Sequence, residues 1–295
     1  MSSSFALSCA RRGEKTLLMQ LNVKDKAASL FGTEEIDTEI REVRENLYAV
    51  NVSPKAAMKE YALMVLKIKL IYRAVFENRV VSSFLKVIPG LNELVMLGKA
   101  YYHVGEEDEE GQPVWDKVVV DAPATGHGIF LLKIPSVITG LIGSGLMFEE
   151  ARRIVELLQD PKRTALALVT LAEEMPVNET LMLSDVVNKE IGLHVACVIA
   201  NGLYPRLFTD EEIQWMDELG PSVADPVGGL VEAARFRRTR GAMQERYLQK
   251  LRDDGSWPVV EMPFLFFEEL ETAVLEELAS LLERTLKSTE ARSVG

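Results

Sequence analysis

An aspartate at the end of an apolar run is the first residue of this sequence that could do chemistry. Asp121 closes the run KVVVD, and a loop of small residues, APATGHG, follows it. A carboxylate in that place can hold Mg²⁺ directly or through water, while the loop that follows responds to a terminal phosphate. The same carboxylate could instead cap the next helix. Thr125, Gly126 and His127 are the loop's candidate binding residues, although a loop histidine can also serve local hydrogen bonding.

Two further strand ends carry polar side chains. Asn22 follows the apolar run that ends at Leu21, and Asn201 ends the run HVACVIAN. Ligands of parallel sheets bind at the carboxyl ends of the strands. The three polar strand ends together therefore indicate one binding edge more strongly than any one of them does.

The elements that must position these residues alternate between strands and helices. Strands are predicted at 16–21, 46–52, 117–121, 164–171, 194–201 and 257–263, with helical segments between them and a final amphipathic helix from Phe266 to Leu286. This alternation is typical of an α/β fold with a doubly wound, mostly parallel sheet in three layers. A helical insertion is expected at about residues 53–104.

Composition excludes several classes of function. The 295 residues are 47% hydrophobic and carry a net charge of −12, which disfavours nucleic acid and anionic membrane surfaces. The arginine run RFRRTR is therefore interpreted as a solvated helix face or a partner for carboxylates. The two cysteines, Cys9 and Cys197, form no CxxC pair, so one chain has no disulfide framework and no four-cysteine zinc site. With no signal peptide at the start, we expect a reducing cytoplasm.

One apolar stretch, residues 128–147, has about the length of a membrane-spanning helix and a single charge, Lys133. Pro135 and several glycines interrupt it, and it directly follows the Asp121 loop. The prediction is a buried helix followed by a loop, with no membrane span.

The stretch VVVDAPATGHGIFLLKIP closely resembles the switch II segment of the ArsA-type anion-pump ATPases and of their relatives that target tail-anchored membrane proteins. In that family an apolar strand, an Asp, small residues, Pro, Thr, Gly, His, a leucine run and a Pro follow one another. Further stretches resemble the family in the right order over nearly the whole chain: VTLAEEMPVNETLMLSDVV, CVIANGLYP, AMQERYLQKL and VVEMPFLFFEEL.

The resemblance implies a P-loop ATPase fold that uses ATP and Mg²⁺. It makes Asp121 the carboxylate that contacts Mg²⁺ through water, and it places Thr125, Gly126 and His127 in switch II. It also assigns Asn22 to switch I, and adenine recognition to Asn201 and Pro263.

Two departures from the family stand out. The sequence holds no phosphate-binding loop of the form GKGGVGKT, and its one Gly-Lys pair, Gly98-Lys99, lacks the preceding glycine pattern. Asn22 stands where the family has an Asp that positions the attacking water. An amide can orient water but cannot take its proton. In the family a central strand precedes this loop. Loss of that strand together with the loop would leave a gap in the sheet.

Two interpretations of the absent loop remain open. In the first, the start codon is placed too late and the natural protein is longer. In the second, the protein is a pseudo-ATPase that pairs with a competent relative. In both, the 295 residues form a single ArsA-like domain, N-terminally incomplete, that is inactive alone.

The expected function is ATP binding and hydrolysis coupled to opening and closing of a dimer, for transport, targeting or regulation of a partner. The alternative is a non-catalytic subunit that forms a heterodimer with a P-loop-bearing ATPase. The Met-rich helices of the insertion, with Met58, Met64 and Met96, could form a groove for a hydrophobic client or membrane partner protein, or they could be core.

Overall fold

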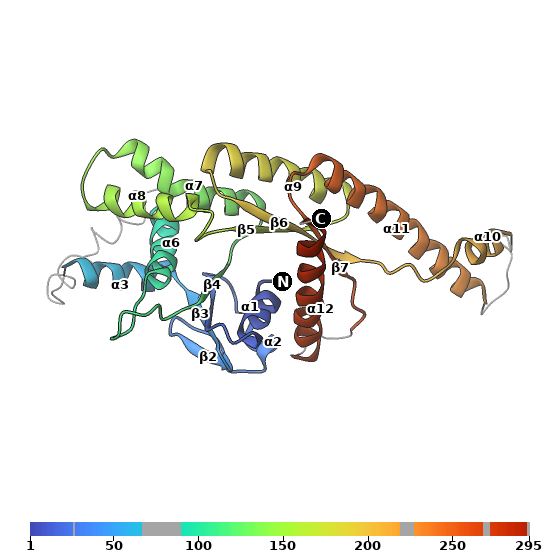
Figure 1. Ribbon diagram of the computed structural model, residues 1–295, viewed down its shortest axis with the longest axis horizontal. Coiled ribbons are helices and arrows are strands. Elements are labelled where there is room, and N and C mark those ends of the chain that lie inside the picture. The colour runs from blue at the N-terminus through green and yellow to red at the C-terminus, as the bar shows by residue number, and fades with distance from the viewer. Residues whose placement is uncertain (26, 67–89, 219–226, 268–271, 294–295) are drawn as a thin grey trace. The chain divides into compact units, whose positions relative to one another are not determined.

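The computed structural model describes residues 1–25, 27–66, 90–218, 227–267 and 272–293 (Figure 1). The chain forms two compact units, each described here by itself. The first holds Met1–Ala165, Val186–His194 and Glu268–Glu283, and the second holds Leu166–Asp185, Val195–Phe267 and Arg284–Gly295. The prediction of one domain over residues 1–295 stays a prediction.

The first unit is built on a four-stranded sheet with the order β2-β3-β1-β4. Its strands are β1 (Thr16–Leu21), β2 (Arg41–Arg44), β3 (Leu47–Val52) and β4 (Lys117–Asp121). β1 pairs in parallel with both β3 and β4, and β2 pairs antiparallel with β3. The helices of this unit are α1 (Ser2–Arg11), α2 (Ala27–Phe31), α3 (Pro54–Leu66), α6 (Leu91–Val104), α7 (Thr125–Leu141) and α8 (Leu146–Gln159), with the short π-helical turn η1 (Val187–Ile191) and the first part of α12 (Thr272–Ser293).

The second unit is built on a three-stranded parallel sheet with the order β5-β6-β7. Its strands are β5 (Leu166–Leu171), β6 (Val195–Leu203) and β7 (Val259–Pro263), and its helices are α9 (Glu174–Val186), α10 (Asp210–Glu218) and α11 (Val227–Asp254). The α/β class and the mostly parallel pairing predicted from the sequence are confirmed. β4 and β5 each have one strand neighbour among the described residues.

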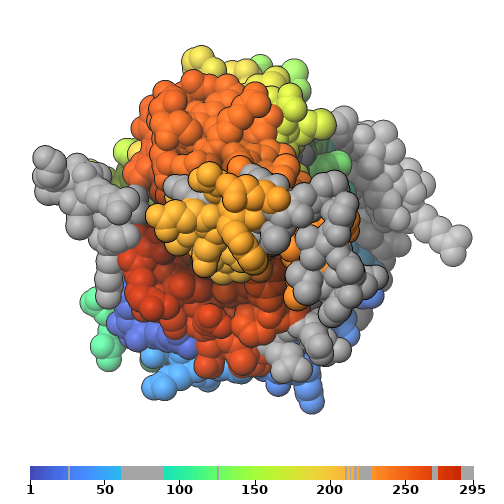
Figure 2. All heavy atoms as spheres, turned by 90° about the vertical axis from the view of Figure 1, so that its right-hand side faces the viewer, coloured from blue at the N-terminus to red at the C-terminus, as the bar shows by residue number. Residues whose placement is uncertain are grey.

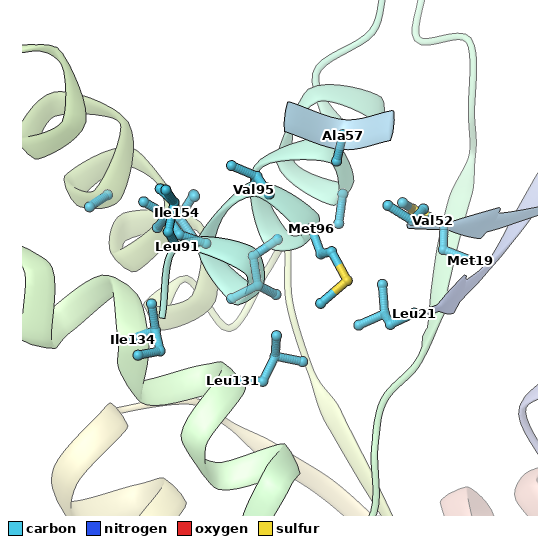
Figure 3. Packing of buried hydrophobic residues seen from close by; sticks show 14 of the residues in the cluster. Met19, Leu21, Val52, Ala57, Leu91, Val95, Met96, Leu131, Ile134 and Ile154 are labelled. Carbon is cyan, nitrogen blue, oxygen red and sulfur yellow. The ribbon is translucent and has the colours of Figure 1, made fainter. Parts of the chain in front are cut away.

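Both faces of the first sheet are covered by apolar packing. One face places Leu17, Met19 and Leu21 of β1 against α6 and α7, as Figure 3 shows for Met19, Leu21, Met96 and Leu131. The other face places Leu18 of β1 against α1 and α12. Since β1 is buried along its whole length, it reads as a continuous apolar run, as expected for a strand covered on both sides.

The described parts of the expected insertion contribute core rather than a free apolar stripe. α6 buries Leu94, Met96 and Leu97, and Met58 of α3 packs at the edge of the same cluster. The side chain of Met64 and residues 67–89 lie outside what the structure describes. For Met96 the core interpretation is therefore confirmed.

One strand and several element boundaries differ from the sequence-based expectation. The strand β2 was not expected, because its sequence REVR is charged and it lies at the edge of the sheet. β6 continues past Asn201 to Leu203, which pairs with Pro263. The last helix begins at Thr272 among the described residues, not at Phe266, whose ring joins an aromatic cluster instead.

The apolar stretch at residues 128–147 forms most of α7, a short connection and the start of α8. Within the described part of the chain, no helix combines the length and apolarity that a bilayer crossing requires. The predicted helix followed by a loop is confirmed.

At the start of the strands β1, β3 and β4, a polar and aromatic cluster fastens the loop of residues 105–116. Glu106 Oε2 accepts a hydrogen bond from Trp115 Nε1 at 2.8 Å and lies 2.8 Å from His103 Nδ1. The Lys15 ammonium lies 5.1 Å from the Trp115 ring centre and 5.5 Å from that of Tyr48. His103 is buried. Through its contacts with His103, Lys15 and Tyr48, the cluster holds the acidic loop against the sheet.

Partial burial would by itself raise the pKa of the Glu106 carboxyl, but hydrogen bonds from His103 and Trp115 and the charges of His103 and Lys15 hold that pKa below its ordinary value of 4.5. A carboxyl whose pKa is lower in the folded state stabilises the fold above its unfolded pKa. This contribution is lost as the pH falls through the folded-state pKa.

Replacing Leu131 by Ala should lower the free energy of unfolding by about 2–5 kcal/mol, because Leu131 is 2% exposed in the core between α7 and the sheet. Leu141→Ala on the same helix is the matched control, since Leu141 is 80% exposed and should change stability by less than about 0.5 kcal/mol. Urea denaturation measures both. Equal losses in the two variants would contradict the described packing of α7.

Replacing Glu106 by Gln should destabilise the protein near neutral pH and matter less as the pH falls below 4.5, where the wild-type carboxyl also becomes protonated. Glu107→Gln, at an exposed neighbouring position, should have little effect at either pH. Thermal unfolding of the three proteins across that range tests this. A Glu106→Gln deficit that grows on acidification would refute the stated direction of the pKa shift.

Candidate functional site

The parallel register of β1 sets a row of polar side chains across the carboxyl end of the first sheet. Gln20 lies directly opposite Asp121 of β4 and directly opposite Asn51 of β3. Paired residues of parallel strands point to the same face. Here that face is the one covered by α1, because the neighbouring residues Leu18, Ala49 and Val119 pack there.

Asp121 ends β4 with an exposed carboxylate that meets the first turn of α1. Its Oδ1 accepts a hydrogen bond of 2.6 Å from the Ser2 hydroxyl. Asp121 does not cap the following helix, because the N-cap residue of α7 is Ala124 and the cap makes no side-chain hydrogen bond. The capping interpretation left open by the sequence is therefore wrong. The carboxylate contacts the first turn of α1 instead.

Two neighbours in the row carry oxygen atoms that lack partners. Gln20 is 4% exposed, and its Oε1 has no hydrogen-bond partner among the described residues. The same holds for Oδ1 of Asn51. Buried acceptors without a donor are costly, so this row suits a hydrated cation or ordered water. Within the described ranges, no group of three or more His, Cys, Asp or Glu side chains could itself hold a metal ion.

Asn22 follows β1 and turns the chain away from the sheet. Its φ of 52° lies in the left-handed region that asparagine tolerates better than most residues. Its backbone N–H donates to the Val52 carbonyl at 2.9 Å, which places Asn22 at the ends of β1 and β3. Asn22 and Asp121 therefore lie at the same edge of one sheet.

The chain after Asn22 is organised by Asp25, a residue that sequence reasoning missed. Oδ1 of Asp25 accepts hydrogen bonds from the backbone N–H groups of Ala27 and Ala28 and from Nε2 of Gln20, and Oδ2 accepts one from the N–H of Ile36. These bonds cap α2 and close the loop over the strand ends. An Asp shortly before a helix is a recognisable capping residue, so this role of Asp25 could have been predicted from the sequence. Its link to Gln20 was visible only in the folded chain.

Thr125, Gly126 and His127 form the first turn of α7, directly after the loop from Asp121. Gly126 and His127 are exposed, and the backbone N–H groups of a first turn have no partners within the helix. Such a turn favours negatively charged ligands. The structure thus brings Asp121, Asn22 and the α7 turn to the carboxyl end of the first sheet, with Ser2, Gln20 and Asn51 beside them.

Asn201 and Pro263 lie together at the carboxyl end of the sheet in the second unit. Asn201 pairs with Leu171 of β5, and Pro263 ends β7 opposite Leu203 of β6. Both residues are half-buried. They form a second group of predicted site residues, described within their own unit.

The cysteines take no part in either group. Burial raises the pKa of the Cys9 thiol to about 11, with Arg12 opposing the shift, and burial also raises the pKa of Cys197. Both thiols are therefore protonated near neutral pH and are weak nucleophiles.

A close contact fixes how α7 leaves the Asp121 loop. A Cβ atom on Gly128 would lie 2.5 Å from the carbonyl oxygen of Pro123, whereas a Cβ on Gly126 would meet nothing within 4 Å. Only glycine fits at position 128 without moving the backbone.

Gly128→Ala should therefore lower the free energy of unfolding by about 1–3 kcal/mol, because the clash is with backbone. Gly126→Ala, two residues earlier in the same turn, is the matched control and should leave stability unchanged or slightly higher. Thermal and urea unfolding measure both. If Gly128→Ala is as stable as Gly126→Ala, the described approach of Pro123 to α7 is wrong.

The sequence is similar to known proteins over most of its length. The sequence model of the family described as Anion-transporting ATPase matches residues 1–146 and 144–218. ATPase BagA of Mycobacterium tuberculosis is 29% identical over 239 residues, covering 79% of this chain and 69% of the relative.

Two relatives are named for arsenical pumps. A putative arsenical pump-driving ATPase of Halobacterium salinarum is 26% identical over 280 residues, covering 89% of this chain and 39% of the relative. The arsenical pump-driving ATPase of Escherichia coli is 26% identical over 223 residues, covering 70% of this chain and 37% of the relative. Because the matched ranges span well over half of the sequence, the chain belongs to the anion-transporting ATPase (ArsA) family.

Proposed function

We propose that this protein binds ATP with Mg²⁺ at the carboxyl end of the first sheet, and that hydrolysis is coupled to opening and closing of a dimer. The observation that carries the proposal is Asp121, a carboxylate at a strand end, beside Ser2 and followed by the uncapped first turn of α7. Family membership supports it, since the relatives are named as ATPases.

The residues of the polar row fit a hydrated Mg²⁺ ion. Mg²⁺ prefers oxygen ligands and keeps several of its waters. Asp121 would hold it, most simply through water, and the unpartnered oxygens of Gln20 and Asn51 could accept hydrogen bonds from such waters. When bound, the ion supplies positive charge to the phosphate oxygens.

The remaining roles fall to this chain's own groups. The backbone N–H groups of Thr125, Gly126 and His127 would bind the terminal phosphate as donors at a helix start. Asn22 would orient water through its amide, and it cannot take the proton from that water. For the second unit by itself, the resemblance to the family implies adenine recognition by Asn201 and Pro263.

Hydrolysis by these 295 residues alone should be slow. They contain no glycine- and lysine-rich loop to hold the phosphates, and an amide stands at position 22. In P-loop ATPases catalysis is mostly positioning and charge stabilisation, so losing both contributions should reduce the rate strongly. A Mg²⁺-dependent rate equal to that of intact relatives would overturn this part of the proposal.

A second candidate function is a non-catalytic subunit that pairs with a P-loop-bearing relative. Asn22 is the observation that favours it, because the change from a carboxylate to an amide removes a charge at the position of the water. The one-sided pairing of β4 among the described residues is compatible with a sheet that is extended by further chain. The total mass of the assembly, measured with and without such a relative, separates a homodimer from a heterodimer.

Replacing Asp121 by Asn should remove the Mg²⁺-dependent part of ATP binding. ATP with Mg²⁺ should raise the melting temperature of the wild-type protein more than ATP alone does, because a ligand of the folded state stabilises it. In Asp121→Asn this difference should vanish. Thermal unfolding with and without Mg²⁺ at increasing ATP concentrations measures it.

Asp253→Asn is the control, since it removes the same charge from an exposed position on α11. It should respond to Mg²⁺ and ATP as the wild type does. Absence of any ATP effect on the wild-type protein would overturn the ATP proposal. An undiminished Mg²⁺ effect in Asp121→Asn would overturn the role of that carboxylate.

A further inference from the structure

The second unit contains a cavity that the proposed ATPase function does not use. Its volume is about 380 Å³, and its walls come from the segment Tyr204–Phe208, which follows β6, and from one stretch of α11 that includes Arg237, Arg238, Gly241 and Glu245. Figure 2 shows the orange atoms of α11 beside the amber atoms of residues that precede it in the sequence. The volume lies in the range typical of small-molecule sites.

The aromatic side of the cavity is held in place by the strand ends. The Tyr204 ring stacks on Phe264, with 5.2 Å between ring centres and 17° between planes, and Phe264 lies 4.7 Å from Phe266. The buried side chain of Gln244 fixes the connection after β6. It accepts from the Tyr204 N–H at 2.8 Å and donates to the Gly202 carbonyl at 3.0 Å.

Arg237 presents a cation to these rings without an anionic partner. Its guanidinium carbon lies 4.4 Å from the centre of the Phe266 ring and 5.8 Å from that of Tyr204. No ion pair joins Arg237 to any carboxylate in the described part of the chain, and its Nε is buried without an acceptor. A buried guanidinium donor without a partner is costly to leave unsatisfied.

Other arginines of α11 form ion pairs with carboxylates, and Arg237 forms none with the described residues. Arg240 pairs with Glu173 at 3.5 Å, and Arg252 pairs with Glu245 at 3.5 Å and also with Glu261. The arginine run was interpreted from the sequence as a solvated face or a partner for carboxylates. That interpretation fits Arg240 but is wrong for Arg237, which stacks on rings at the wall of a cavity.

The charge of the cavity wall is positive. Arg206, Arg237 and Arg238 line it together with Glu245, which contacts Arg252, and Arg206 and Arg238 also interact with other groups of the protein. The protein as a whole carries −12, so a cationic wall is a local exception to its composition. Flat apolar surface beside a guanidinium is the chemistry that recognises an anionic group on a ring.

We propose that this cavity binds a small organic anion, with a carboxylate or phosphate group paired to Arg237 and a flat apolar body against Tyr204 and its neighbours. The forked guanidinium can donate two parallel hydrogen bonds to either kind of anionic group. This inference does not depend on the ATPase proposal.

The test titrates the 295-residue protein with four single-ring probes and follows binding by calorimetry and by NMR shifts. Benzoate and phenyl phosphate should bind saturably at one site. Benzyl alcohol and benzylamine, which have the ring without the anion, should bind at least about tenfold more weakly, as expected for a hydrogen bond to a charged group. The tighter of the two anions identifies whether the natural group is a carboxylate or a phosphate.

Arg237→Gln should weaken the binding of both anions at least about tenfold, with no change for benzyl alcohol. Arg246→Gln is the matched control, because Arg246 is an exposed arginine of the same helix outside the cavity wall. If Arg237→Gln does not fold, Arg237→Lys keeps the charge but loses the fork, and it should weaken anion binding by a smaller factor.

Three outcomes would overturn the proposal. The first is equal binding of the anions and benzyl alcohol. The second is unchanged anion binding in both Arg237 variants. The third is displacement of the probes by ATP, which would assign the cavity to the nucleotide. Failure of ATP to bind at all would leave the anion result intact, so the two proposals fail separately.

Discussion

The register of β1 against its two parallel neighbours decides which side chains meet at the candidate site. Gln20 opposite Asp121 and Asn51 puts three polar residues on one face, at the end of a sheet that is otherwise apolar. A slip of one residue in β1 would turn Gln20 into the core beside α6 and bring Leu21 to the polar row. The apolar residues that alternate with Gln20 prevent this, because Leu17, Met19 and Leu21 fill the core on the opposite face. Packing in the interior thus fixes the chemistry at the edge.

The second constraint on the site is the close approach of the Asp121 loop to the first turn of α7. It depends on a glycine, which has no side chain. The helix begins at Thr125 without a side-chain cap, and Gly128 lets the Pro123 carbonyl come close to its first turn. A capped start would satisfy some of the N–H groups that an anionic ligand needs. The site therefore combines a close approach of the loop to α7 with N–H donors that have no side-chain cap among the described residues.

The strands of the site could be predicted because each contains consecutive apolar residues. LLM in TLLMQL and VVV in KVVVD form these runs, and both segments become parallel strands, β1 and β4. The edge strand β2 could not be predicted because three of its four residues are charged and only Val43 is buried.

Residues whose role depends on pairing between distant segments could not be predicted. Gln20 reads as one polar residue in an apolar run, and only its register partners show that it belongs to a polar row. Asp25 reads as a cap for α2, and its bond to Gln20 depends on how the loop folds back. The stacking of Arg237 on Phe266 joins residues from α11 and from the chain after β7, so the run RFRRTR alone suggested only a charged surface.

The two candidate sites present opposite demands. Beside the Asp121 carboxylate, two buried acceptors lack partners among the described residues, Oε1 of Gln20 and Oδ1 of Asn51. At the cationic wall of the cavity, a buried donor, Nε of Arg237, lacks a partner in the same part of the chain. Unsatisfied groups of either kind cost about 1–3 kcal/mol each, so a fold retains them only where something else compensates. Acceptors around a carboxylate call for a cation or for donor water, and a guanidinium among rings calls for an anion. The polar row and the cavity beside Arg237 therefore favour ligand groups of opposite charge.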